Sequence, residues 1–236
     1  MTGAMDSRRV AYLKALDIDV WERRDLAPAA AVAVPAADGG AQPGWAELER
    51  AVKTCTLCPL HKTRTQGVFG VGNRSAQWMV IGEAPGADED RQGEPFVGRA
   101  GQLLNSMLKA IGLKREQVFI ANILKSRPPN NRDPKPEEVQ ACIPYLFRQI
   151  ELVNPKLILC VGRIAAQTLL ETDTSIGKLR GQLHRIAGNR PMVVTYHPAY
   201  LLRSPGEKRK SWADLLLALR TFEQLAGGAS TAGAST

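Results

Sequence analysis

Four short apolar segments, separated by stretches with helical periodicity, constrain the fold of this chain more than any other feature of its sequence. The segments are WMVIGEA from residue 78, VFIANIL from 118, LILCVG from 157 and MVVTYH from 192. Helical patterns lie between them at about residues 100–112, 136–151 and 162–170. Buried strands that alternate with helices form parallel sheets, and right-handed crossovers place helices on both faces. We therefore predict an α/β fold, a three-layer α/β/α sandwich with a four-stranded parallel central sheet.

Composition divides the chain into four parts. Residues 1–26 include apolar side chains at helical spacing, which predicts an N-terminal helical segment. Residues 27–44 are rich in Ala, Pro and Gly, which is typical of a linker. Residues 45–225 contain the four apolar segments and are expected to form one catalytic domain. Residues 226–236 are small and polar, and we expect a disordered tail there.

The charge of the chain favours an anionic partner such as nucleic acid. Its 31 Lys and Arg residues exceed its 23 Asp and Glu residues, giving a formal net charge of +8. The N-terminus lacks the basic-then-apolar order of a secretion signal, and no apolar run approaches the roughly 18 residues that a membrane span needs. We expect a cytoplasmic monomer without membrane contact. In a reducing compartment, paired cysteines more often serve metal or redox chemistry than structural disulfides.

Polar and glycine-rich segments leave three of the four predicted strands. In parallel sheets, ligands bind outside the carboxyl ends of the strands. The first exit is GEAPGADED from Gly82, a tight turn with exposed amides and four carboxylates. The second is NILKSRPPNNRDP from Asn122 and the fourth is HPAYLLRS from His197, whereas the third, VGRIAAQ, runs directly into a helix. These exits predict a ligand site at one edge of the sheet.

Three side chains near the exits are candidates for binding a planar polar ligand. Phe96, in the segment EPFVGRAG, either packs in the core or offers a stacking platform for a base. Asn122 carries a donor and an acceptor that match the imide edge of a pyrimidine, although backbone groups are the more common partners of a buried Asn. His197 ends the fourth strand directly before a proline, which holds its backbone extended. We expect His61 and His184 on the surface.

The segments GEAPGADED, EPFVGRAG, NILKSRPPNNRDP and HPAYLL, in this order, resemble the family 4 uracil-DNA glycosylases over about residues 50–220. The resemblance implies a three-layer α/β/α fold, a 4Fe-4S cluster, and hydrolytic release of uracil from single-stranded or duplex DNA in base excision repair. It also implies that Phe96 stacks on an extruded uracil, that Asn122 bonds its polar edge and that His197 faces its O2. The uracil-binding candidates are Gly82, Glu83, Ala84, Phe96, Asn122 and His197.

Stabilisation of a uracil anion is the catalytic chemistry that the resemblance implies. Cleavage of the N-glycosidic bond leaves an oxocarbenium-like sugar and a uracil anion, so a donor from His197 to O2 stabilises charge in the transition state. The larger superfamily carries Asp at the position of Ala84 and Tyr at that of Gly86, so this chain lacks both that base and that guard against thymine. Glu89 is our candidate for positioning water, and Glu83 is expected to share in recognition.

Candidate DNA contacts follow the last predicted strand. Leu201 or Leu202 is expected to fill the position that uracil leaves in the base stack, and Arg203 is expected to meet phosphates. Arg132, in the second exit, is a further DNA-binding candidate. Basic residues that can share this role are Lys208, Arg209 and Lys210.

The cysteines match the family's cluster ligands at three of four positions. The family has a CxxC pair, a Cys in a KCRPP stretch and a Cys about sixteen residues later; Cys55, Cys58 and Cys142 fit three of these, and Ser126 stands at the fourth. We predict a cluster that is present but more labile than usual, with a serine alkoxide or an open iron site. The alternative that Cys160 reaches the site is opposed by its place inside a strand, where a buried Cys is usual.

Two other functions are compatible with the sequence. A related group traps uracil-DNA covalently through a His in the loop after the second strand, but the loop here, KSRPPNNRDPK, has none. A catalytically impaired DNA-binding module with an iron-sulfur cluster or zinc is the other, and zinc needs His61 or another donor beside the three cysteines. The intact set of Phe96, Asn122 and His197 favours the enzyme.

Overall fold

The structure, a computed structural model, describes residues 42–227 of the 236 in the chain. The predicted N-terminal helical segment, most of the predicted linker and nearly all of the predicted tail lie outside these residues. The described part opens with helix α2 (Trp45–Lys53), which begins where the sequence predicts the folded domain to begin. Within 42–227, no helix combines the length and the apolar character that a membrane crossing requires.

One six-stranded mixed sheet forms the centre of the fold, in the order β1-β3-β2-β4-β6-β5. Its four inner strands are parallel, as predicted: β3 (Phe119–Asn122), β2 (Trp78–Gly82), β4 (Leu157–Val161) and β6 (Arg190–Thr195). The prediction of four strands missed two antiparallel edge strands, β1 (Val71–Gly72) and β5 (Leu183–Ile186). The first has only two residues and the second is mostly exposed, so neither leaves an apolar run in the sequence.

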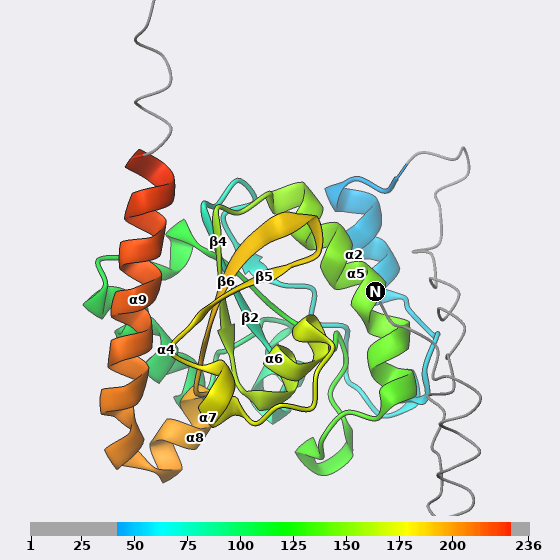
Figure 1. Cartoon of the computed structure of the whole chain (residues 1–236). Coiled ribbons are helices and arrows are strands. Elements are labelled where there is room, and N and C mark those ends of the chain that lie inside the picture. Colours follow the sequence, from blue (N-terminus) through cyan, green and yellow to red (C-terminus); the bar gives the residue numbers. More distant parts are fainter. Residues whose placement is uncertain (1–41, 228–236) are drawn as a thin grey trace, which may run out of the picture. The chain divides into compact units, whose positions relative to one another are not determined.

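Helices cover both faces of the sheet, which confirms the predicted three-layer α/β/α sandwich (Figure 1). The four inner strands are buried along almost their whole length because apolar side chains point to both faces. One face packs against α2, α5 (Pro136–Val153), α6 (Arg163–Leu170) and α7 (Ile176–Leu179). The other face packs against α4 (Arg99–Ala110), α8 (Pro198–Arg203) and α9 (Lys208–Gly227).

The carboxyl ends of the parallel strands meet at one edge of the sheet. Gly82, the last residue of β2, pairs with Asn122, the last residue of β3. On the other side of β2, Val161 of β4 pairs with Thr195 of β6, two residues before His197. Strand pairing therefore brings the first, second and fourth exits together, as the ligand-site prediction requires.

Candidate active site

A cavity of about 400 Å³ opens at this edge of the sheet, and we call it the central pocket. Its lining comes from all three polar strand exits and from the loop that contains Phe96. The side chains on which its chemistry depends are Glu83, Phe96, Asn122, His197, Tyr200 and Arg203. Ala84, Glu89 and Arg132 also line it. The structure thus gathers side chains from positions more than 100 residues apart in the sequence.

Asn122 offers an unpaired amide to the central pocket. The residue is only 3% exposed, and its Oδ1 has no hydrogen-bond partner among residues 42–227. Gly82 keeps the space beside this amide open: a Cβ on Gly82 would lie 2.5 Å from Asn122 Oδ1 and 2.6 Å from Phe96 Cζ. A buried polar atom without a partner costs about 1–3 kcal/mol, and a ligand that bonds it removes that cost. The described structure therefore offers no backbone partner for Oδ1, the alternative considered from the sequence.

His197 is a neutral hydrogen-bond donor at the pocket wall. It is the N-cap of α8, where its Nδ1 accepts a hydrogen bond of 3.1 Å from the backbone amide of Ala199. Since Nδ1 is an acceptor, the ring proton lies on Nε2. Burial, assisted by the positive charge of Arg203, lowers the pKa of His197 to about 4. The imidazole is therefore neutral at physiological pH and keeps an N–H for a ligand.

The relation between the Phe96 and His197 rings limits how a planar ligand can bind. Their centroids are 5.5 Å apart and their planes differ by 30°. A planar ligand between them would need about 7 Å, because each aromatic contact takes about 3.5 Å or more. A base in this pocket therefore stacks on Phe96 and meets His197 at its edge, rather than lying between the two rings.

The backbone at Phe96 is held in a conformation that non-glycine residues rarely adopt. Its φ is +55°, in the left-handed region. Arg115, in the 3-10 helix η2 (Arg115–Gln117), donates hydrogen bonds to the carbonyls of Phe96 and Pro95 at 3.2 and 2.6 Å. A Cβ on Gly101 would lie 1.8 Å from the Phe96 carbonyl oxygen. Arg115 could not be predicted as part of the site, since nothing in its local sequence links it to a loop 19 residues earlier.

The two candidate acids have different surroundings. Glu89, in helix α3 (Ala87–Gln92), accepts hydrogen bonds from the amides of Gly86, Val97 and Gly98 at 3.1, 3.0 and 3.3 Å. Its carboxylate therefore joins the first exit to the Phe96 loop. The Glu83 carboxylate has no hydrogen-bond partner in the described part of the chain. Burial, reinforced by the negative charge of Asp133, raises the pKa of Glu83 to about 7.

Comparison with known proteins identifies the family of this site. The profile of the "Uracil DNA glycosylase superfamily" matches residues 69–217. A type-4 uracil-DNA glycosylase of Archaeoglobus fulgidus is 49% identical over 71% of this chain and 88% of its own length. The type-4 enzyme of Pyrobaculum aerophilum is 44% identical over 72% of this chain and 91% of its own length.

The chain belongs to the type-4 uracil-DNA glycosylases. A type-5 uracil-DNA glycosylase, also from Pyrobaculum aerophilum, is less similar, at 31% identity over 62% of this chain and 74% of its own length. The resemblance inferred from the four motifs is thereby confirmed.

In this type-4 glycosylase, one of the two leucines predicted to fill the base stack is buried. Leu201 is 1% exposed and belongs to the core cluster formed with α4, α9 and the inner strands, which favours Leu202 for that role. Leu202 is half-buried, whereas Tyr200 and Arg203 are exposed and line the central pocket. Arg132 also lines the pocket, but its guanidinium is paired with the buried carboxylate of Glu138.

The four predicted cluster positions lie near one another. Cys58 and Cys142 belong to one buried cluster, and Tyr145 Oη donates to Cys55 Sγ at 3.4 Å. The neighbouring Cys142 thiol lowers the pKa of the Cys58 thiol. Ser126 is buried beside these residues. The sulfurs come from the loop after α2 and from α5, so a group bound there would join these two segments.

The surroundings of Ser126, at the fourth predicted position, are not those of a metal ligand. Arg64 Nη1 donates to Ser126 Oγ at 2.7 Å, and Arg64 Nη2 donates to the Cys55 carbonyl at 2.9 Å. In residues 42–227, no three His, Cys, Asp or Glu side chains are arranged to hold a metal ion. Cys160 is buried inside β4, in a core cluster separate from that of Cys58 and Cys142. Three of the four predicted positions thus carry thiols, and the hydroxyl at the fourth accepts a hydrogen bond from Arg64.

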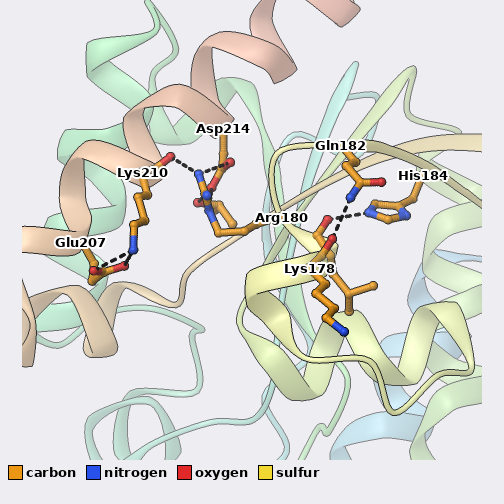
Figure 2. A network of polar contacts seen from close by, with 9 residues as sticks. Lys178, Arg180, Gln182, His184, Glu207, Lys210 and Asp214 are labelled. Atoms are coloured by element: carbon orange, nitrogen blue, oxygen red, sulfur yellow. Dashed lines mark hydrogen bonds and ion pairs between the residues drawn. The ribbon is translucent and has the colours of Figure 1, made fainter.

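The two other histidines are half-buried rather than on the surface as expected. His61 Nδ1 lies 2.7 Å from the carbonyl oxygen of Cys58. His184 Nε2 lies 2.6 Å from the carbonyl oxygen of Leu179. Figure 2 marks this contact of the His184 ring with a dashed line. One ring nitrogen of each is bonded to nearby backbone, and neither residue lines the central pocket.

Proposed function

We propose that the central pocket binds a uracil turned out of DNA and that the protein hydrolyses its N-glycosidic bond, leaving an abasic site. The unpaired amide of Asn122 carries this proposal. An amide that presents both a carbonyl and an NH₂ matches the N3–H and O4 of uracil, whereas cytosine offers the opposite pattern at these atoms. Phe96 stacks on the base, and Gly82 and Ala84 leave room for it.

His197 supplies the main catalytic interaction in this proposal. As the bond to the sugar breaks, negative charge grows on uracil O2, and a fixed N–H donor stabilises it more in the transition state than in the ground state. A neutral imidazole suits this task because it donates through Nε2 while Ala199 holds the ring through Nδ1. The low pKa keeps the donor neutral throughout the physiological range.

Glu83 is the better candidate for positioning the attacking water. Glu89 is the candidate from the sequence, but its carboxylate already accepts three backbone hydrogen bonds. Glu83 lines the same pocket with a free carboxylate. A general base works best when its pKa lies near the working pH, and the pKa of Glu83 is about 7. Glu89 then acts by fixing the shape of the Phe96 loop.

The rate of uracil release should rise with pH through about 7. Glu83 must be ionised to accept a proton from water, and its raised pKa means that most molecules carry the neutral acid below pH 7. Single-turnover rates from pH 5 to 9 should rise about tenfold per unit below the pKa and level off above it. Glu83→Gln should be slower and insensitive to pH over this range.

Asp133→Asn provides a second test of this pH dependence. The Asp133 carboxylate raises the pKa of Glu83, and it also pairs with Arg163 at 2.8 Å. Removing this charge frees Arg163 to stabilise the Glu83 carboxylate. The midpoint of the rate profile should therefore move to lower pH in Asp133→Asn. If the rate of Glu83→Gln depends on pH in the same way as that of the wild type, Glu83 has no part in the mechanism.

The proposed function is tested by uracil release under multiple-turnover conditions. Full-length protein, well below the substrate concentration, is mixed with a labelled single strand or a U:G duplex, and abasic sites are cleaved with alkali. Many uracils released per protein molecule support the glycosylase. One uracil per molecule, with protein attached to DNA, would indicate covalent capture. DNA binding without release would indicate an impaired binding module.

We also propose that Cys55, Cys58 and Cys142 hold a 4Fe-4S cluster that lacks a fourth thiolate. Type-4 membership supports a cluster in general, and the proximity of the three thiols supports these ligands. Such a cluster cross-links the loop after α2 to α5, and hydrolysis requires no electron transfer from it. Because Arg64 engages Ser126 Oγ, we propose that the fourth iron lacks a ligand from Ser126.

Ser126→Cys should make the cluster more stable. A thiolate at this position supplies the ligand that iron-sulfur clusters prefer. Anaerobically purified Ser126→Cys should approach four irons and four acid-labile sulfides per chain and lose iron to a chelator more slowly than wild type. The control is Ser106→Cys, which adds a thiol on the exposed surface of α4. Equal iron retention in all three proteins would refute the proposed ligand set.

The proposed division of the chain keeps the sequence boundaries. Residues 45–225 are the glycosylase domain of a cytoplasmic monomer, preceded by a helical segment, 1–26, and a linker, 27–44, and followed by a tail, 226–236. The start of α2 at Trp45 supports the first boundary of the domain. Helix α9 ends at Gly227, close to the second.

A further inference from the structure

Helix α8 presents a tyrosine and an arginine at the rim of the central pocket. Leu201 turns into the core, whereas Tyr200 is 36% exposed and lines the pocket together with Arg203. Residues three apart share one face of a helix, so Tyr200 and Arg203 point to the same side. The aromatic ring available to DNA beside the pocket is therefore that of Tyr200.

A second aromatic ring supports Tyr200 from beneath. The rings of Tyr196 and Tyr200 have centroids 5.0 Å apart, with planes inclined at 44°. The guanidinium carbon of Arg180 lies 5.5 Å from the centroid of the Tyr196 ring, within the range of a cation–π contact. Arg180, Tyr196 and Tyr200 thus form a continuous layer from α7 to the pocket rim, which we call the aromatic platform.

Buried charges fix the base of the aromatic platform. Arg180 Nε and Nη2 donate to the two Asp214 carboxylate oxygens at 2.9 and 2.7 Å, and Nη2 also donates to the Lys210 carbonyl at 2.6 Å (Figure 2). The fully buried Asp214 also accepts from Thr195 Oγ1 at 2.8 Å. Bidentate, charge-assisted bonds hold a guanidinium in one orientation. The platform is therefore tied to α9 and to the end of β6.

The surface around the platform is positively charged. Arg203, Lys208 and Arg209 are exposed on α8 and at the start of α9. Lys210 is paired with Glu207 at 2.8 Å, whereas Arg203, Lys208 and Arg209 form no ion pair within residues 42–227. Cationic side chains that follow a phosphate backbone, combined with an aromatic ring on which a base stacks, are typical of single-strand binding sites.

We propose that Tyr200, backed by Tyr196 and Arg180, stacks on an unpaired base next to the uracil in the same DNA strand. This inference rests on the proposed function of the central pocket. Since Tyr200 and the uracil-binding residues line one cavity, a neighbouring nucleotide reaches the ring when uracil occupies the pocket. In a duplex, that neighbour must leave its base pair and its stack before it meets Tyr200. This step costs more free energy in a duplex than in a single strand. The platform therefore favours uracil in unpaired DNA.

The test combines a change in the protein with a change in the DNA. Full-length protein is assayed on single strands in which the uracil has natural neighbours, or in which the 5′ or the 3′ neighbour is a base-free tetrahydrofuran. Loss of one stacking partner is worth about 5- to 150-fold. For the wild type, kcat/KM should fall by this factor when the stacked neighbour lacks its base. Tyr200→Ala should lose a similar factor on the natural strand and be insensitive to the missing base.

Two variants serve as controls. Tyr200→Phe keeps an aromatic ring and should behave like the wild type. Trp212→Ala removes another exposed aromatic side chain, 42% exposed on α9 and outside the central pocket, and should change neither kcat/KM nor its dependence on the neighbour. The inference is overturned if Tyr200→Ala remains as sensitive to the missing base as the wild type, or if it slows both substrates equally.

A binding measurement separates this inference from the proposed function. A single strand that carries 2-aminopurine beside an uncleavable uracil analogue should lose fluorescence when the wild-type protein binds, because stacking quenches 2-aminopurine. Tyr200→Ala should bind without this quenching. If the wild type quenches fluorescence but releases no uracil from natural strands, the glycosylase proposal fails and stacking stands. If uracil is released without quenching, stacking fails and the glycosylase stands.

Discussion

Replacing His197 with alanine should slow uracil release by about 10²- to 10³-fold in single-turnover assays. The Nε2–H of this neutral ring faces the position where negative charge grows on uracil O2 in the proposed mechanism. Removal of one such donor from a preorganised site typically costs this factor. The loss should appear in the rate of the chemical step, because the interaction strengthens only as the glycosidic bond breaks.

A second variant at His197 is needed to separate an effect on the chemical step from an effect on stability. Alanine also removes the acceptor that caps α8, which costs about 1 kcal/mol of stability. Asparagine is a good N-cap residue but is too short to replace Nε2. His197→Asn should therefore lose activity as strongly as His197→Ala and keep the wild-type melting temperature. His184→Ala, at a histidine outside the central pocket, should remain active. A wild-type rate in His197→Asn would contradict the role of this side chain.

Replacing Asn122 with leucine should lower kcat/KM for uracil by about 10²- to 10⁴-fold without lowering stability. Uracil N3–H and O4 would each lose a partner in a buried site, at about 1–3 kcal/mol apiece. In the free protein, however, Asn122 Oδ1 already lacks a partner among the described residues, so an apolar side chain of similar volume relieves a cost. The expected signature is a large loss of activity with an unchanged or higher melting temperature.

Gln149→Leu is the matched control for this combination of effects. Gln149 is equally buried, but its amide is satisfied: Oε1 accepts from Lys125 Nζ at 2.7 Å and Nε2 donates to the Phe69 carbonyl at 2.8 Å. Leucine there leaves the buried Lys125 amine and the Phe69 carbonyl with fewer partners, so the melting temperature should fall. If Asn122→Leu is destabilised as much as Gln149→Leu, the Asn122 amide serves the fold rather than a ligand.

Those parts of the fold that depend on local pattern could be predicted from the sequence. The four inner strands are continuous apolar runs, and parallel pairing places their carboxyl ends together whatever the loops contain. Asn122 and His197 could therefore be assigned to one edge of the sheet before the structure was available, whereas the resemblance to the family implied that Phe96 joins them. The edge strands β1 and β5 could not be found, because one is very short and the other is largely exposed.

Side-chain partners could not be predicted, because they depend on how distant segments pack. Helix α8 has six residues, too few for its periodicity to show that Leu201 is buried and Tyr200 exposed. Glu89 was one of four acids in a turn, and only its three amide partners distinguish it from Glu83. Arg64 had no visible link to Ser126, 62 residues later, until the fold placed them 2.7 Å apart.

The way in which Phe96 is held has a consequence for folding. Its left-handed backbone depends on Glu89 of α3, Arg115 of η2 and the close approach of Gly101 of α4. These groups belong to three different elements within residues 89–115, and the loop alone would relax to a more favourable conformation. A nascent or partly unfolded chain therefore lacks the surface on which a base stacks. Release of uracil therefore depends on the packing of α3, η2 and α4 around Phe96 as well as on the residues that line the central pocket.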